Sequence, residues 1–181
     1  VGVGLTALDD ITSSDYSTAV GYSALTACTA GVNNTGVGRY ALSTITTGDS
    51  CTAVGFGALI VNTAVSNTAV GRSALGATTS GTANAAVGAY SLDANTTGTQ
   101  NTAVGYASLS ANTTASTNVA VGYQSLFTNT TGGTNTAVGT YSLYPNTTGI
   151  GNTALGYNAL GANTTADTNT AVGFRALQAN T

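Results

Sequence analysis

The residue types that most often carry catalysis are scarce in this chain. It contains no His, Lys, Glu or Trp, and its only charged side chains are six Asp and three Arg. No Ser lies next to a side chain that could act as its general base, so an activated hydroxyl nucleophile is not indicated. We therefore expect neither an enzymatic activity nor a cofactor.

The acidic residues gather at one place only, where Asp9, Asp10 and Asp15 lie close together near the start. Carboxylates at such spacing are one way to bind calcium, so a metal site is conceivable there. A solvated polar edge at one end of the fold is the favoured interpretation, because exposed strand edges are commonly blocked by charge. We therefore predict no metal-binding residue.

Two cysteines, Cys28 and Cys51, are the remaining candidates for covalent chemistry. Each takes a position that is Asn in other copies of a repeat, and they are 23 residues apart. The spacing leaves two alternatives open: a disulfide between adjacent turns or two separate thiols. A disulfide would agree with an extracellular location.

The whole chain repeats one short pattern. A Gly recurs in eleven copies, preceded by Val in ten of them and by Leu155 in one; of the ten intervals nine are 17 residues long and one, from Gly55 to Gly71, is 16. A Leu stands four residues after this Gly in every copy. A short fixed period is typical of a solenoid, in which each repeat covers the apolar face of its neighbour.

The period favours a β-solenoid, because helical solenoids need about 33 or more residues per repeat. Recurrent Gly and β-branched residues also disfavour helix. We predict an all-β fold: a parallel β-solenoid, or β-roll, of eleven coils of 17 residues. Each coil would contain two short strands, one in NTAVG and one in ASLSAN. Residues 1–181 would form a single repeat solenoid that is a segment of a longer fibrous protein.

Side-chain alternation suggests which residues form the interior. In NTAVG the Thr and Val share one face, and the Ala and Asn share the other. One copy has Val119 at the Thr position, which suggests that the Thr and Val face is packed. We therefore predict a narrow core in which Val of one strand meets Leu of the other: Val20, Leu25, Val104, Leu109, Val121, Leu126, Val138 and Leu143.

Turn-forming residues close both ends of each coil. The corner glycines, such as Gly105, Gly122 and Gly139, permit a tight bend, and the NTTG stretch closes the other end. In the 16-residue interval the missing residue falls in the turn between Asn62 and Asn67. The strands on either side should therefore stay in register.

Stacked coils place identical side chains in columns about 4.8 Å apart. Asn side chains in such a column can hydrogen-bond along the stack. One Asn ladder is formed by Asn95, Asn112, Asn129, Asn146 and Asn163, and a second by Asn101, Asn118, Asn135, Asn152 and Asn169. The first five are also Asn-x-Thr glycosylation motifs in form, but the repetition of NTT produces this match automatically.

An aromatic residue follows the corner Gly by one or two positions in most copies. The simplest role for this row is packing over the corner, and a sugar-binding stripe is the alternative. The row consists of Tyr22, Tyr40, Phe56, Tyr90, Tyr106, Tyr123, Tyr141, Tyr157 and Phe174.

Charge and hydropathy exclude two kinds of partner. Charged residues make up 5% of the chain and the net charge is -3, so nothing could neutralise the phosphates of a nucleic acid. No apolar run approaches the ~18–20 residues that cross a bilayer, so membrane insertion is not expected.

The pattern NTAVGY followed by AL and ANTTG resembles the N-S-V-A-I-G head repeats of trimeric autotransporter adhesins. It is also similar to the NTAVGYQAL and NTTG arrays in the shafts of phage and phage-like tail fibres. The resemblance covers essentially all 181 residues. It implies a left-handed parallel β-roll that trimerises and binds host surfaces, either on a cell surface or in a virion fibre.

Three hypotheses for function follow. The leading one is a non-enzymatic, extracellular structural and adhesive fibre that presents a repetitive Asn, Thr and Tyr surface to a host-surface or glycan target and self-associates, as a homotrimer by resemblance. The second is a filament subunit that stacks end to end, with its C-terminal edge covered by more of the same chain or by the next subunit. The third is an ice-binding solenoid, which needs Thr-x-Thr on a strand face rather than the adjacent Thr of NTT.

Overall fold

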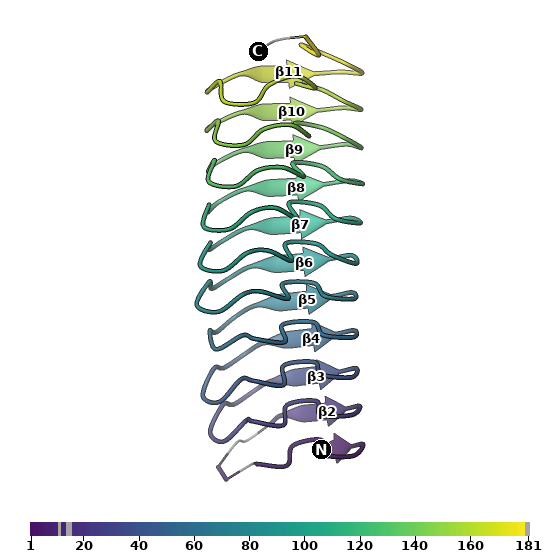
Figure 1. Ribbon diagram of the computed structural model, residues 1–181, viewed down its shortest axis with the longest axis vertical. Coiled ribbons are helices and arrows are strands. Elements are labelled where there is room, and N and C mark those ends of the chain that lie inside the picture. Colours follow the sequence, from purple (N-terminus) through teal and green to yellow (C-terminus); the bar gives the residue numbers. More distant parts are fainter. Residues whose placement is uncertain (11, 14–15, 180–181) are drawn as a thin grey trace.

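The chain winds into one parallel β-solenoid (Figure 1). The structure is a computed structural model, and it describes residues 1–10, 12–13 and 16–179. Its eleven strands lie in sequence order in a single sheet, which confirms the all-β solenoid predicted from the repeat. The strands are β1 (Gly2–Val3), β2 (Thr18–Val20), β3 (Thr35–Val37), β4 (Thr52–Val54), β5 (Thr68–Val70), β6 (Ala85–Val87), β7 (Thr102–Val104), β8 (Val119–Val121), β9 (Thr136–Val138), β10 (Thr153–Leu155) and β11 (Thr170–Val172).

Each strand pairs with the residues one period away, so identical positions stack. Thr102 of β7 lies beside Val119 of β8, for example. Register also holds across the short interval, where Thr52 pairs with Thr68 and Val54 with Val70, as predicted. With parallel strands about 4.8 Å apart, the stack forms a rod roughly 50 Å long.

The missing residue of the short interval lies in the turn, as the sequence predicted. Asn62 Nδ2 donates to the carbonyl of Ala64, two residues further on. In a complete coil Asn112 Nδ2 donates to the carbonyl of Ala115, three residues further on. The turn is therefore shortened by one residue while its hydrogen bond is kept.

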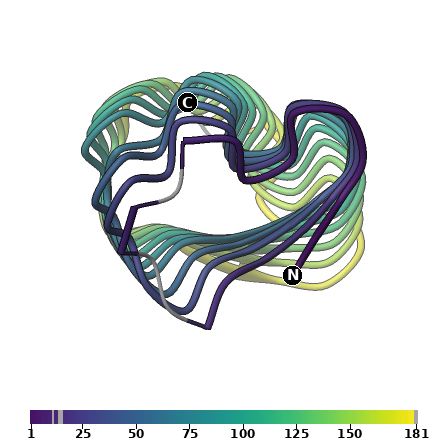
Figure 2. The ribbon, with the colours of Figure 1, turned by 90° about the horizontal axis from the view of Figure 1, so that it is seen from below.

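The coil is left-handed. In Figure 1 the strands run to the right on the far side and the return segments cross in front to the left as the chain rises. Figure 2, which looks along the rod from below, agrees and shows one nearly straight side, formed by the strands, and a folded return path opposite. Successive coils are also rotated slightly, so the columns wind around the long axis.

Each coil contains one strand rather than the two predicted. After the corner, positive φ recurs at every second residue: 134° at Gly105, 50° at Ala107 and 53° at Leu109. Strand residues require negative φ, so this segment cannot be extended. It nevertheless bonds to the next coil, since Leu109 N donates to the Ser125 carbonyl at 3.0 Å.

The Leu column fills the interior, as predicted. The predicted core leucines Leu25, Leu109, Leu126 and Leu143 are all fully buried. Each has a φ between 50° and 53°, the left-handed region that β-branched residues avoid. Leu is unbranched at Cβ, which explains why this apolar position does not alternate with Val or Ile.

The prediction that Val faces the interior was wrong. Val20 and Val104 are 38% and 37% exposed, and Val121 and Val138 are half-buried on the outer face of the sheet. The middle residue of the strand points inward instead, as Ala103 does with no exposed surface.

Gly36, which occupies that middle position in β3, shows why Ala is selected there. A Cβ added to Gly36 would already lie 3.2 Å from both the Ala41 carbonyl oxygen and Leu25 Cγ. The Leu column thus leaves room for a methyl group and nothing larger. Alternation separated the two faces correctly, but the width of the coil decides which face is inside.

Two neighbouring residues test this assignment. Ala120→Val should destabilise the fold by about 1–3 kcal/mol or more, because it overpacks a site with no free volume. Val121→Ala, on the outer face, should cost less than about 1 kcal/mol. Denaturant unfolding of both variants shows which substitution lowers the free energy of unfolding more. A larger loss for Val121→Ala would indicate that Val, and not Ala, faces the interior.

The backbone at the Leu column gives a second prediction. Leu109→Ala should cost about 2–5 kcal/mol, as expected for a buried Leu. Leu109→Ile should cost about 2 kcal/mol or more, although volume-conserving changes usually cost under about 1.5 kcal/mol, because a β-branched residue is strained at positive φ.

Leu109→Met is the matched control, since Met conserves volume without branching at Cβ. It should cost less than about 1.5 kcal/mol in the same unfolding measurement. Equal costs for the Ile and Met variants would show that the left-handed backbone does not select Leu.

Candidate functional site

The described part of the chain contains no conventional active-site geometry. It encloses no pocket, and no three His, Cys, Asp or Glu side chains lie together where they could hold a metal ion. Of the acidic cluster, Asp9 and Asp10 are exposed, and Asp15 lies outside the described residues. Within the same ranges no helix has the length and apolar character that a membrane span requires. The candidate functional features are therefore the columns.

The first column, called the turn ladder, is the fully buried set Asn95, Asn112, Asn129, Asn146 and Asn163. Its side chains bond along the stack, as the sequence predicted. Asn112 Nδ2 donates to Asn95 Oδ1 at 2.9 Å, and Asn146 Nδ2 donates to Asn129 Oδ1 at 2.8 Å. The amides thus satisfy one another inside the rod, where an unpaired polar group would be costly, except that Asn163 Oδ1 has no hydrogen-bond partner among the described residues.

The second column, called the strand ladder, consists of Asn101, Asn118, Asn135, Asn152 and Asn169 and precedes each strand. Its side chains also bond to main chain. The backbone N of Asn118 donates to Asn101 Oδ1 at 3.0 Å, and that of Asn135 donates to Asn118 Oδ1 at 2.9 Å. This ladder therefore holds the start of each strand against the coil before it.

The two ladders meet at one carbonyl in each coil. The Ala115 carbonyl accepts from Asn101 Nδ2 at 2.9 Å and from Asn112 Nδ2 at 3.0 Å. The Gly132 carbonyl accepts in the same way from Asn118 and Asn129. The interior consequently combines buried Leu and Ala side chains with a connected amide network.

The cysteines occupy these ladders, one in each. Cys28 stands at a turn-ladder position and Cys51 at a strand-ladder position, and both are buried thiols with no disulfide between them. Cys51 Sγ donates to the Ala64 carbonyl at 3.3 Å and contacts Asn62 Nδ2 at 3.4 Å. Burial raises the pKa of the Cys51 thiol. Cysteine here substitutes for the amide as a weak hydrogen-bonding group.

The turn ladder is also interrupted at Thr78, which stands between Asn62 and Asn95. The Thr78 hydroxyl is buried and has no hydrogen-bond partner. A Thr side chain is too short to bridge to the equivalent residues of the neighbouring coils. Thr78 therefore interrupts the hydrogen bonding between Asn62 and Asn95, and the buried Ile45 interrupts the same column on the other side of Asn62.

Completing the ladder should stabilise the rod. In Thr78→Asn the new amide can donate to Asn62 Oδ1 and accept from Asn95 Nδ2. We expect a gain of about 1 kcal/mol in the free energy of unfolding, the usual net value of an intramolecular hydrogen bond. Thr97→Asn, at an exposed turn position, should change stability by less than about 0.5 kcal/mol.

Removing an amide from the turn ladder serves as the second control. Asn129→Ala leaves Asn112 Oδ1 without its donor and one N–H of Asn146 Nδ2 without its acceptor, while Asn146 Nδ2 still donates to the Gly149 carbonyl. Each orphaned group costs about 1–3 kcal/mol, so the loss should be about 2 kcal/mol or more. A neutral Thr78→Asn together with a neutral Asn129→Ala would contradict a stabilising role for the ladder.

The glycosylation motifs coincide with the turn ladder. Their Asn side chains are fully buried and hydrogen-bonded, so the folded rod does not offer them to a modifying enzyme. The Thr that follows is used as well: Thr113 Oγ1 donates to the Thr130 carbonyl at 3.3 Å. The NTT repetition therefore has a structural origin.

The corner glycines lie where the sequence placed them. Gly105, Gly122 and Gly139 have φ values of 134°, 135° and 128°, which side-chain-bearing residues rarely adopt. A Cβ at Gly122 would also lie 2.7 Å from the Gly139 carbonyl. The corner thus excludes every other residue type both by conformation and by contact with the next coil.

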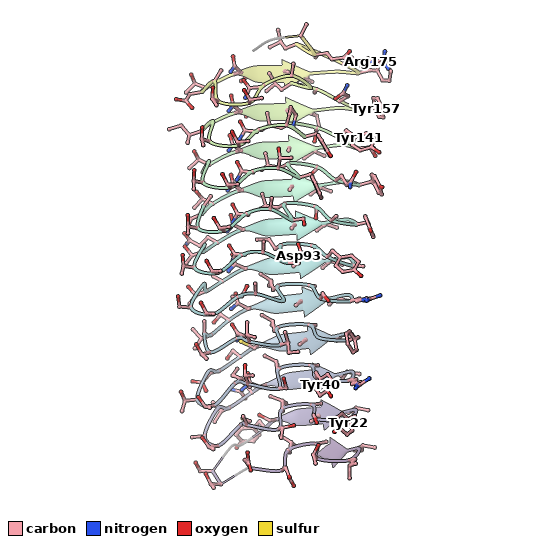
Figure 3. All side chains as sticks on the ribbon, viewed as in Figure 1. Tyr22, Tyr40, Asp93, Tyr141, Tyr157 and Arg175 are labelled. Carbon is pink, nitrogen blue, oxygen red and sulfur yellow. The ribbon has the colours of Figure 1, made fainter. Side chains whose placement is uncertain are left out.

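The aromatic residues form one row along this corner, called here the aromatic ladder. It consists of Tyr22, Tyr40, Phe56, Tyr90, Tyr106, Tyr123, Tyr141, Tyr157 and Phe174. Figure 3 shows labelled members Tyr22, Tyr40, Tyr141 and Tyr157 along the edge where the strands end. Centroids of successive rings in contact lie 5.3–6.3 Å apart, mostly edge to face.

An Arg fills the one gap in the aromatic ladder. In the coil between Phe56 and Tyr90, the guanidinium of Arg72 lies 5.9 Å and 5.5 Å from the centroids of these two rings. Arg39 similarly lies 4.7 Å from the Tyr40 ring. Cation–π contacts of this kind keep the π surface continuous.

The straight side of the coil presents a second surface, called here the strand face. It consists of the outward Thr and Val columns of β2–β11, and no residue in these strands is charged. Val87 is 40% exposed and Val172 65% exposed. Because the sequence prediction placed these residues inside, it missed this surface. The Ala that recurs between Thr and Val in the strands was the available signal that the other face points inward.

Other polar side chains serve the contact between coils. Asp49 Oδ1 accepts the backbone N–H of Val32 at 2.8 Å, and Ser110 Oγ donates to Asp93 at 2.6 Å. Burial raises the pKa of Asp93, and the bond from Ser110 opposes that rise. Desolvation among the aromatic rings, together with Tyr123, raises the pKa of Tyr141.

No protein-family model, curated protein or solved structure matches this chain.

Proposed function

We propose that the chain is a non-enzymatic structural and adhesive segment of an extracellular fibre. One observation carries this proposal: equivalent positions of the coils stack in columns, so the strand face and the aromatic corner recur along the rod. The resemblance to adhesin heads and tail-fibre shafts supports an extracellular setting and a host-surface target. A rigid, repetitive rod spaces and displays binding groups, which is what such a fibre requires.

Self-association through the strand face is part of the proposal. The face is uncharged and its Val side chains are substantially exposed, as Val104 is at 37%. A second copy has the same spacing and twist, so its columns can interdigitate along the full length. Partners without this period cannot match it. The resemblance to trimeric adhesin heads supports a homotrimer.

The size of the strand face limits the strength of this contact. The ten strands of this face, about 4.8 Å apart and each about 10 Å long, cover about 500 Å² per copy. Standard stable interfaces bury about 800 Å² per partner. Association of this segment should therefore depend on concentration unless residues beside the face also take part.

The structure does not favour ice binding. The outward pattern on the strand face is Thr-x-Val, and the Thr column is interrupted by Ala85 and Val119. Figure 2 shows that the coils rotate about the axis, so the face is twisted rather than flat. An ice lattice needs a flat and regular array.

Sedimentation velocity over a dilution series tests the proposal. The wild-type chain should sediment as an associated species that dissociates on dilution. The triple variant Val87→Lys, Val104→Lys and Val121→Lys should be monomeric at all concentrations, because buried unpaired charges oppose contact.

The matched control places the same charges elsewhere. Thr97→Lys, Thr114→Lys and Thr131→Lys change exposed turn residues outside the strand face and should leave association unchanged. A wild-type chain that stays monomeric throughout, or equal effects of the two triple variants, would exclude the strand face as the contact.

A further inference from the structure

The aromatic ladder is continuous although its residues come from two different sequence positions. Between Tyr22 and Phe174, four coils lack an aromatic residue directly after the corner Gly; in three of them the following residue is Tyr, and in the fourth Arg72 bridges the rings. In these three coils Arg39 is followed by Tyr40, Ala89 by Tyr90 and Thr140 by Tyr141. Edge-to-face contacts on either side of Tyr141, at 89° and 82°, join it to the rings of the neighbouring coils. A row that is maintained by alternative residues indicates that its continuity matters.

The rings remain accessible although they contact one another. Tyr106, Tyr123 and Tyr157 are 48%, 44% and 40% exposed. Mutual packing fixes their orientation before any ligand arrives, which lowers the entropy lost on binding. The ladder is therefore a preorganised apolar surface with a row of phenolic hydroxyl groups.

The side chains beside the rings are polar and mostly neutral. Between β7 and β11 they include Gln124, Thr140 and Asn158, and the first charged one is Arg175 at the far end. Rings bind the apolar C–H faces of sugars, while amides and hydroxyls bind sugar hydroxyl groups. We propose that the aromatic ladder binds an extended neutral polysaccharide, such as a β-1,4-linked glucan, along the rod axis.

The spacing of the ladder supports a polymer rather than a single sugar. Successive ring centroids lie 5.5 Å apart between Tyr106 and Tyr123, and 5.5 Å apart between Tyr123 and Tyr141. This separation is comparable to the length of one pyranose unit in an extended β-linked chain. Weak contacts at each coil would add along the polymer, so affinity should rise with chain length.

Charge argues against two other extended ligands. Nucleic acids also stack on aromatic rows, but their binding requires a basic groove, and this chain has three Arg against six Asp. Acidic polysaccharides are disfavoured for the same reason. The neutral glycan is thus the extended ligand whose chemistry the ladder matches.

The ligand class rests on the adhesive role proposed above, and isothermal titration calorimetry with β-1,4-linked glucose oligomers tests it. The wild-type chain should bind the hexamer on the order of tenfold more tightly than the trimer, because the longer oligomer spans more coils. Replacing every ring of the aromatic ladder by Leu should abolish binding of both oligomers, because rings left in either half of the rod would still offer a site. Leu keeps apolar packing at the corner, and circular dichroism checks that this variant folds.

The matched control replaces Thr97, Thr114, Thr131 and Thr148 by Ala on the exposed turn column and should bind as the wild type does. The proposal is overturned if neither oligomer binds, if affinity does not depend on length, or if the Leu variant still binds. It is also overturned if the Leu variant loses self-association and the wild type binds no glycan, because the ladder is then a contact between copies. Intact self-association through the strand face without glycan binding would refute this ligand and leave the fibre proposal standing.

Discussion

In-register hydrogen bonding between neighbouring coils is the constraint on which the rest of the structure depends. Main-chain groups on the strand side and on the return side bond to their equivalents one period away, as Thr96 N does to the Thr113 carbonyl at 2.8 Å. A conformation adopted in one coil is thereby imposed on the next. The left-handed φ of the Leu column and the unusual φ of the corner Gly recur through the stack for this reason. Residues that cannot adopt these conformations would break two sets of contacts, one on each side.

This constraint also explains why polar side chains occupy so much of the interior. A narrow coil buries main-chain carbonyls that point inward, such as those of Ala115 and Gly132. Two Asn amides converge on each of these carbonyls and then bond to the Asn of the adjacent coil. The network is satisfied only when the same residue recurs at the same place. The amide ladders therefore specify register as well as contributing stability, since a coil shifted by one residue would bury unpaired groups.

Much of this arrangement could be predicted from periodicity alone. The period identified the solenoid, the Leu column, both Asn ladders, the corner Gly and the aromatic row, because in-register stacking converts recurrence in sequence directly into adjacency in space. The positions of Val104 and Ala103 could not be predicted in this way. Alternation defines two faces, but only the width left by Leu on the facing segment decides that Ala is inside. The prediction of a second strand in each coil was wrong for a similar reason. Hydropathy carries no information about the sign of φ at Ala107 and Leu109.

The division between interior and surface has a functional consequence. Each inward position accepts few residue types, because Leu, Ala, Asn and Gly are fixed by conformation, volume or hydrogen bonding. The outward positions carry no such restriction, yet they also recur: Thr and Val on the strand face, and rings at the corner.

The aromatic ladder continues even where the ring moves from the first to the second residue after Gly, as at Tyr90 and Tyr141. Main-chain stacking does not require an aromatic side chain there, so the recurrence must come from side-chain packing or from the surface itself. Exposure of 40–48% at Tyr106, Tyr123 and Tyr157 leaves much of each ring unused by packing. A surface that repeats with the coil is best suited to a partner that also repeats, whether a polymer lying along the rod or another copy of the rod.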